Sequence, residues 1–305
     1  MNVQWYPGHM TKAKRMMQEN IKLIDLIIEL LDARVPLSSR NPDIDELGKN
    51  KARLILLNKA DLADERCNDA WMEYFKARGC FVVKVNAKSG AGLKQIQPVV
   101  QEACREKIER DRRRGILNRP VRAMVVGIPN VGKSTFINSF AGKACTKTGN
   151  KPGVTKGAQW IKLNKQLELL DTPGILWPKF EDQQVGMKLA MIGSIKDEIL
   201  NTEELALSLI RFLVQWYPEA LEKRYQLADG TAAGTDPAAG TDPAAGTDPV
   251  AVLERIAKVR GCIVKGSQLD ITKAAGILLE DYRSGRLGRI TLEFPEGNET
   301  VIVNK

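Results

Sequence analysis

The segment RAMVVGIPNVGKSTFINSF, residues 122–140, most constrains the fold, because it joins an apolar run to a glycine-rich loop and then to a helical pattern. The loop, Gly127–Ser134, fits the spacing G-x-x-x-x-G-K-[ST]. In such a loop backbone N–H groups surround phosphates, the lysine reaches the β and γ oxygens, and the hydroxyl ligates magnesium. The sequence therefore predicts a phosphate-binding strand–loop–helix unit, in which Lys133 and Ser134 have the last two roles.

A second motif, DTPG at Asp171–Gly174, follows the apolar run QLELL. We expect Asp171 to hold magnesium through a water molecule, and the Gly174 N–H to meet the γ-phosphate of a nucleotide. Both motifs would then lie at the carboxyl ends of strands, which is where α/β proteins bind ligands.

Two further motifs indicate which base the nucleotide carries. In NKAD, Asn58–Asp61, the Asp61 carboxylate can accept hydrogen bonds from the ring N–H and the exocyclic amine of guanine, and adenine has neither donor there. A site built on such bonds can reject the analogue by roughly 10⁴-fold or more, because an unpaired buried carboxylate is costly. In NAK, Asn86–Lys88, the Ala87 N–H would meet the guanine oxygen.

Strand and helix patterns alternate in the first part of the chain. The runs DLIIELLDARVP, ARLILLNKAD and CFVVKVNAKSG are typical of buried strands, the first ending at Pro36, and DERCNDAWMEYFKARG has helical spacing. The segment REKIERDRRRGILNRPVR predicts a charged helix end followed by a linker. This alternation predicts an α/β domain built on a largely parallel sheet.

Helical patterns dominate from about Glu181 onward. We predict helices in TEELALSLIRFLVQWY, VAVLERIAKVRG and DITKAAGILLEDYRSG, and a short closing strand in RITLEF. The residues that share one face of the last helix are Ile271, Ala274, Leu278 and Tyr282.

Three copies of AAGTDP fill residues 232–249. They lack large apolar side chains, so burial cannot offset the entropy of ordering them. We therefore predict two domains, residues 1–180 and 181–305, the second containing a flexible low-complexity insert at 229–249.

The composition limits the class of protein and its partners. A net charge of +9 favours a polyanionic partner, with nucleic acid ahead of an anionic membrane surface, although excess charge can also serve solubility alone. The longest apolar candidate, LIDLIIELL, is interrupted by Asp25 and Glu29 and is shorter than the about 18 residues of a membrane span. Five cysteines without a C-x-x-C pair, and one histidine, favour reduced thiols in the cytosol over a zinc site.

The motif set resembles the translation-factor-like GTPases of the phosphate-loop class, but in a different order. Here NKAD and NAK precede GIPNVGKS, Thr155 in KPGVT, and DTPG, so the domain is circularly permuted. With WYPGHM in front, LDARVPLSSRNP before NKAD and GRLGRITLE at the end, the chain closely resembles the ribosome-biogenesis GTPase family called YlqF or RbgA, except in the AAGTDP repeats. The resemblance implies an α/β, circularly permuted phosphate-loop GTPase domain with a smaller, mostly α-helical C-terminal domain.

The resemblance also implies a function. It indicates a GTPase that acts late in maturation of the large ribosomal subunit, that is slow alone and stimulated by the ribosomal particle, and that binds pre-ribosomal RNA in a nucleotide-dependent way. We expect GTP, GDP, the large subunit and its rRNA as partners, no membrane partner, a monomer and a cytoplasmic location. Two alternatives stay open: a nucleotide-gated RNA-binding protein with little hydrolysis, and an ATP-using phosphate-loop enzyme in which NKAD is accidental.

Two consequences concern the C-terminal domain. The permutation sends the chain from DTPG directly into this domain, so movement of Gly174 on loss of the γ-phosphate can be passed to the helices covalently. No base-reading module is apparent, so we expect recognition of RNA shape and backbone. The basic residues that we expect to contact phosphates are Lys258, Arg260, Lys265, Arg283, Arg286 and Arg289.

The motifs of the family assign roles to individual residues. The magnesium set is Ser134, Thr155 and Asp171. Asn130 matches the position that ligates potassium beside the phosphates in potassium-stimulated relatives, where added positive charge would stabilise the transition state; the alternative is that it braces the loop. Lys133 is also assigned a catalytic role. The nucleotide-binding set is Asn58, Lys59, Ala60, Asp61, Asn86, Ala87, Lys88, Asn130, Val131, Gly132, Lys133, Ser134, Thr135 and Gly174.

The single histidine, His9, is the remaining candidate catalytic residue. In familiar relatives a glutamine after the glycine of the D-x-x-G switch orients the attacking water, but here Ile175 occupies that position and cannot bond to water. WYPGHM could lie near the switch, with Gly8 providing a turn and the imidazole orienting water or offsetting phosphate charge. The alternative is a surface histidine, or one that holds Trp5 and Tyr6 against the sheet.

Overall fold

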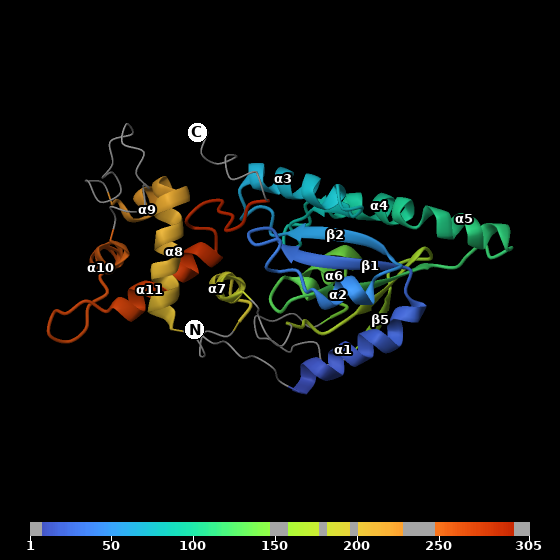
Figure 1. Ribbon diagram of the computed structural model, residues 1–305, viewed down its shortest axis with the longest axis horizontal. Coiled ribbons are helices and arrows are strands. Elements are labelled where there is room, and N and C mark those ends of the chain that lie inside the picture. The colour runs from blue at the N-terminus through green and yellow to red at the C-terminus, as the bar shows by residue number, and fades with distance from the viewer. Residues whose placement is uncertain (1–7, 147–157, 177–181, 196–200, 228–247, 296–305) are drawn as a thin grey trace.

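The computed structural model describes residues 8–146, 158–176, 182–195, 201–227 and 248–295, with side chains from residue 11 onward (Figure 1). Its sheet has six strands in the order β3-β2-β1-β4-β6-β5. The strands are β1 Leu26–Asp32, β2 Ala52–Asn58, β3 Phe81–Lys84, β4 Val121–Gly127, β5 Gln159–Lys162 and β6 Leu167–Asp171. All neighbouring pairs are parallel except β5 with β6, so the motif-bearing ends of β2, β3, β4 and β6 meet at one edge.

Helices cover both faces of this sheet. Figure 1 shows α3, α4 and α5 along one side and α1 along the other, an arrangement that buries β1 over its whole length. The helices of this half are α1 Gly8–Asn20, α2 Asp43–Leu47, α3 Glu65–Lys76, α4 Ile96–Ala103, α5 Arg105–Arg113 and α6 Lys133–Ala141, with short 3-10 turns at Ile21–Leu23 and Leu93–Gln95. The predicted α/β fold is confirmed.

One local prediction in this half is wrong, and several elements were not predicted. The first strand ends at Asp32 and not at Pro36, because the chain turns there: the Val35 N–H donates to the Asp32 carbonyl (2.9 Å), and the Asp32 N–H donates to Ser39 Oγ (3.0 Å). The sequence patterns did not predict α1, α2, α4 or the edge strand β5.

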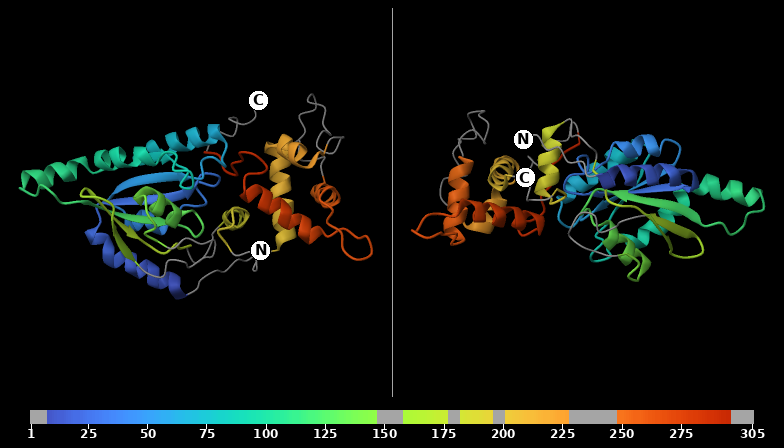
Figure 2. Two further views of the ribbon diagram at one scale, coloured as in Figure 1. Left: turned by 180° about the vertical axis from the view of Figure 1, so that it is seen from behind. Right: turned by 90° about the horizontal axis from the view of Figure 1, so that it is seen from below.

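A group of helices lies beside the sheet half (Figures 1 and 2). They are α7 Gln183–Met191, α8 Thr202–Trp216, α9 Pro218–Tyr225, α10 Pro249–Val259 and α11 Ile271–Arg283. Side chains of Asn201, Asp248 and Asp270 accept N–H groups in the first turns of α8, α10 and α11, which is why these helices begin there. On α11 the predicted face is buried at Ala274, Leu278 and Tyr282, and Ile271 is partly buried.

The closing segment RITLEF, residues 289–294, is not a strand, which corrects the prediction. It returns to the sheet half, where the Ile290 N–H donates to the Leu62 carbonyl (3.0 Å) and the Leu292 N–H to the Arg34 carbonyl (2.8 Å). These acceptors lie in two separate loops, so the segment finds single partners and no strand to form a ladder with.

The domain boundary near residue 180 falls among residues 177–181, outside the described residues, and stays a prediction. Most of the predicted insert, residues 229–247, also lies outside them. Its last two residues belong to α10 instead, Asp248 as the N-cap and Pro249 in the first turn. Across the described part of the chain, no helix combines the length and apolarity that crossing a membrane requires. All five cysteines are free.

Candidate nucleotide site

The phosphate loop connects β4 to α6, as predicted. Gly132 has φ +96°, and a Cβ built on it would lie 2.5 Å from Asn58 Nδ2, so only glycine fits this position. Asn130 also has a positive φ, 58°, which asparagine tolerates better than most residues. Ser134 and Thr135 follow in the first turn of α6, and both residues are partly exposed.

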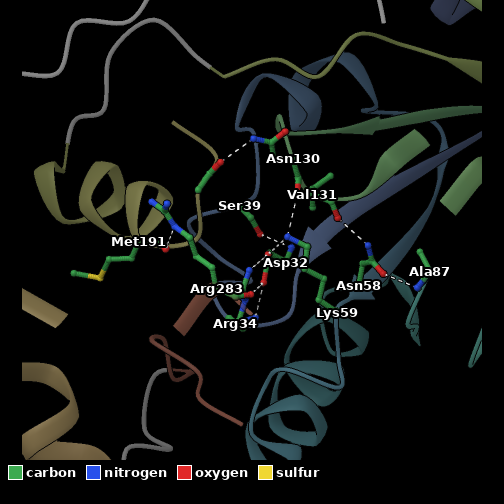
Figure 3. A network of polar contacts seen from close by, with 11 residues as sticks. Asp32, Arg34, Ser39, Asn58, Lys59, Ala87, Asn130, Val131, Met191 and Arg283 are labelled. Carbon is green, nitrogen blue, oxygen red and sulfur yellow. Dashed lines mark hydrogen bonds and ion pairs between the residues drawn. The ribbon is translucent and has the colours of Figure 1, made fainter. Parts of the chain in front are cut away.

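The NKAD motif is bound to the phosphate loop by its side chains (Figure 3). Asn58 Nδ2 donates to the Val131 carbonyl at 2.8 Å, and Lys59 Nζ donates to the Asn130 carbonyl at 3.0 Å. Ala60 is partly buried and Asp61 is exposed. The motif thus leaves the Asp61 carboxylate exposed, while Asn58 and Lys59 hold the motif against the phosphate loop.

The NAK loop lies beside the same motif. The Ala87 N–H donates to Asn58 Oδ1 at 3.0 Å, and Asn86 Oδ1 accepts the Lys88 N–H at 2.9 Å. The sequence predicts that the Ala87 N–H donates to the guanine oxygen. In the structure this N–H donates to Asn58 Oδ1, so a bond to guanine would require a bifurcated hydrogen bond. Ser139 Oγ, on α6, donates to the Ala87 carbonyl at 2.6 Å and fixes the loop against the phosphate-binding helix.

Lys133 and Asp171 form a buried pair beneath the loop, with Lys133 Nζ 3.2 Å from Asp171 Oδ1. Burial raises the pKa of Asp171 above its ordinary value, although the Lys133 charge acts in the opposite direction. Asp171 Oδ2 is buried and has no hydrogen-bond partner among the described residues.

An orphaned carboxylate oxygen suits magnesium, which prefers oxygen ligands. Asp171 and Ser134 would hold this ion, and its charge would offset that of the phosphate oxygens. Thr155, the third predicted ligand, lies outside the described residues.

The DTPG loop packs against the phosphate loop. A Cβ at Gly174 would lie 3.1 Å from Pro129 Cα, and Thr172 Oγ1 donates to the Val125 carbonyl at 2.8 Å. Ile175 is buried, with 5% of its surface exposed, so this position offers an apolar side chain and no group for water.

Helix α1 lies close to this switch. Ile175 and Met17 of α1 line one cleft of about 520 Å³, and Lys14 Nζ lies 2.8 Å from Asp43 Oδ1 at its rim. His9 lies in the first turn of α1, about 12 Å along the helix axis from Met17 at 1.5 Å per residue. Gly8 is helical, so it does not provide the predicted turn. The His9 side chain lies outside the described residues, and its catalytic role stays a prediction.

Asn130 also joins the two halves of the molecule. Its Nδ2 donates to the carbonyl of Gly193, just beyond the end of α7, at 2.8 Å (Figure 3). A potassium ion would need the other amide atom, Oδ1. The potassium assignment stays a prediction.

Sequence reasoning assigned no role to Asp32 and Arg34, although they lie in the quoted segment LDARVPLSSRNP. Both are buried: Asp32 is fully shielded and Arg34 is 1% exposed. Lys59 Nζ lies 2.9 Å from Asp32 Oδ2. The available signal was a charged pair at the end of a buried strand, at the edge where the other motifs lie.

Comparisons with known proteins show what the chain is similar to. A family model described as "50S ribosome-binding GTPase" matches residues 122–230. Ribosome biogenesis GTPase A of Bacillus cereus is 48% identical over 97% of this chain and 95% of that protein, and its Thermotoga maritima namesake is 30% identical over 96% and 95%. The GNP-bound structure of YlqF from T. maritima matches with a TM-score of 0.62 and 27% identity, covering 93% of this chain and 99% of that one. The chain therefore belongs to the ribosome biogenesis GTPase A family, RbgA or YlqF, and the predicted family, permuted fold and GTPase class are confirmed.

Proposed function

We propose that this GTPase acts late in maturation of the large ribosomal subunit and binds pre-ribosomal RNA in a nucleotide-dependent way. The observation that carries the proposal is the 2.8 Å contact of Asn130, in the phosphate loop, with Gly193, beside α7. A change at the phosphates can therefore reach the helices directly, in addition to the covalent route from DTPG. We propose the large subunit as the partner because the description of the matching family model names the 50S ribosome.

In this proposal hydrolysis is slow alone and stimulated by the particle. Lys133 and Ser134 serve the phosphates, magnesium completes the site with Asp171, and potassium binds at Asn130. The guanine motifs read the base through Asp61. The protein acts as a cytoplasmic monomer.

The RNA-binding surface lies on the helical half, which consists of helices α7 to α11. Lys258 and Lys265 are exposed near one end of it, and Arg289 is 58% exposed where the chain returns to the sheet half. Arg260 and Arg286 both contact the buried carboxylate of Asp281. Arg283 donates to the carbonyls of α7, so we leave it out of the RNA surface. Lysines and arginines of this kind contact the RNA backbone, and binding should weaken with salt.

Co-sedimentation with purified large-subunit precursors tests the proposal. We expect the protein to sediment with these particles in the presence of a non-hydrolysable GTP analogue and to be released with GDP, whereas ADP and an ATP analogue have no effect. A Lys258→Glu/Lys265→Glu variant should sediment less, and a Lys22→Glu/Lys76→Glu variant, which changes exposed lysines of the sheet half, serves as the matched control.

GTP turnover with and without the particles separates the alternatives. Faster turnover on the particles supports the proposal. Nucleotide-dependent sedimentation without turnover would favour a nucleotide-gated RNA-binding protein, and a preference for adenine nucleotides would favour an ATP-using enzyme. Association with the small subunit alone would contradict the proposed particle.

A further inference from the structure

Asp32 lies at the centre of a buried charge network at the end of β1 (Figure 3). Arg34 binds it in a bidentate manner, with Nε 2.9 Å from Oδ1 and Nη2 2.8 Å from Oδ2. Lys59 Nζ lies 2.9 Å from the same Oδ2. One carboxylate thus pairs with two cations, one of which belongs to the guanine motif.

The charge state of this group follows from its partners. Burial alone would raise the pKa of Asp32, but the charges of Arg34 and Lys59 outweigh it and hold that pKa well below its ordinary value. Asp32 is therefore ionised at neutral pH and attracts the Lys59 ammonium.

Lys59 connects this carboxylate to the phosphate loop. Its Nζ also donates to the Asn130 carbonyl at 3.0 Å, so it bridges Asp32 and the loop that surrounds the phosphates. Its backbone has φ +58°, a conformation that residues other than glycine rarely adopt and that tertiary contacts must hold. The position of Lys59 thus sets the spacing between the subsites for base and phosphate.

The network continues into the helical half. Arg34 Nη1 donates to the carbonyl of Arg283, the last residue of α11, at 3.3 Å. Arg283 in turn donates to the carbonyls of Met191 (3.0 Å) and Ala190 (2.8 Å) at the end of α7.

These contacts close a ring, because the end of α7 also meets the phosphate loop. The Gly193 carbonyl, two residues beyond α7, accepts from Asn130 Nδ2. The ring therefore passes from the guanine motif through Asp32 and Arg34 to α11 and α7 and returns at Asn130.

We propose that Asp32 is a positioning residue of the guanine nucleotide site: it holds Lys59 against the phosphate loop, and Arg34 links it to the ends of α11 and α7. The inference rests on the assignment of Lys59 to the nucleotide site. A pre-positioned lysine lowers the ordering cost of nucleotide binding. Because Arg34 spans Asp32 and α11, the docking of the helices affects guanine affinity through the same carboxylate.

A double-mutant cycle on GDP binding tests the first part. Asp32→Asn keeps the shape of the side chain and removes its charge, and Lys59→Met removes the ammonium. We expect each to weaken GDP binding by about tenfold or more, because a charged hydrogen bond is lost. In the Lys59→Met background, Asp32→Asn should add no more than about threefold, because coupled residues are not additive. Two independent, multiplying effects, or wild-type affinity in Asp32→Asn, would overturn the proposal.

Glu29→Gln is the matched control. Glu29 lies on the same strand, is buried and pairs with Arg53, yet it contacts no residue of the guanine motif among the described residues. We expect its GDP affinity to match that of the wild type. Urea unfolding of each variant separates loss of folding from loss of positioning. If Asp32→Asn does not fold, Asp32→Glu keeps the charge but displaces it by one methylene, and it should weaken GDP binding only while Lys59 is present.

Arg283→Met tests the link to the helices. It removes the donors to α7, and we expect GDP binding to weaken by about threefold in the wild type and to stay unchanged in Asp32→Asn. An equal effect in both backgrounds would overturn the link. The site assignment has a separate readout: if Lys59→Met and Asp61→Asn both bind GDP as the wild type does, the assignment of the guanine site fails, irrespective of Asp32.

Discussion

At the scale of single residues, we propose that Asp61 determines which base the site accepts. Its carboxylate is exposed at the end of β2, while Asn58 and Lys59 hold the motif against the phosphate loop. We expect Asp61→Asn to weaken GTP binding by about 100-fold or more, because the two guanine donors lose their charged acceptor. Xanthine nucleotides, whose extra carbonyl suits an amide donor, should then bind better than GTP. Unchanged GTP affinity without a xanthine preference would contradict this.

His9 is the second residue for which we predict a measurable effect, here on the rate of GTP hydrolysis. Ile175 is buried and apolar and cannot orient water, and α1 shares a cleft with that residue. We expect His9→Ala to slow GTP hydrolysis by about tenfold or more with nearly unchanged nucleotide affinity, and most strongly on ribosomal particles. Single-turnover rates on the particles measure it. A wild-type rate there would assign water positioning to backbone groups, a cation or the RNA.

Local spacing allowed most site residues to be predicted from sequence. The phosphate loop, NKAD, NAK and DTPG are each recognisable from a few consecutive residues. Each also follows a predicted strand, and this position supported the assignment. Asp32 and Arg34 differ, because their partners are distant in sequence: Arg34 and the carbonyl of Arg283 are separated by 249 residues. No local pattern specifies such a pair.

At the scale of elements, the predicted strands and helices are those with strong apolar periodicity. The parallel strands β1, β2, β3, β4 and β6 and the helices α3, α8, α10 and α11 were predicted from it. Helix α1, which is largely polar, and β5, with a single buried residue, gave too little signal. RITLEF gave a false one, because its alternating apolar residues are buried by loops and helices rather than by a neighbouring strand.

One prediction concerns the phosphate loop, because this loop supplies both the proposed potassium ligand, Asn130, and the contact with the segment after α7. If Asn130 ligates potassium beside the phosphates, potassium chloride should accelerate GTP hydrolysis by about tenfold over sodium chloride, since added positive charge stabilises the transition state. Asn130→Ala should remove the difference between the salts. Equal wild-type rates in the two salts would leave Asn130 as a brace between the loop and Gly193.

At the scale of the whole molecule, the end of the described chain holds the two halves together. The Glu293 carboxylate accepts the N–H groups of Leu37 (2.7 Å) and Ser38 (3.0 Å), and its carbonyl accepts Trp71 Nε1 at 3.0 Å, all in the sheet half. The next residue, Phe294, contacts the helical half, with its ring 5.1 Å from that of Trp216 on α8. One short segment therefore bonds to both halves, which the sequence alone did not indicate.

This arrangement predicts that a small change in the closing segment destabilises the whole protein. Leu292 is 3% exposed, and its N–H is bonded to the loop that contains Arg34. We expect Leu292→Ala to lower the free energy of unfolding by about 2–5 kcal/mol, the usual cost of a cavity at a buried leucine. Leu117→Ala, at a leucine that is 74% exposed, should change it by no more than about 0.5 kcal/mol. Urea unfolding followed by circular dichroism measures both. Because the segment contacts both halves, we expect GDP affinity to fall together with stability in Leu292→Ala. If Leu292→Ala instead destabilises the helices alone, the sheet half folds independently of this segment.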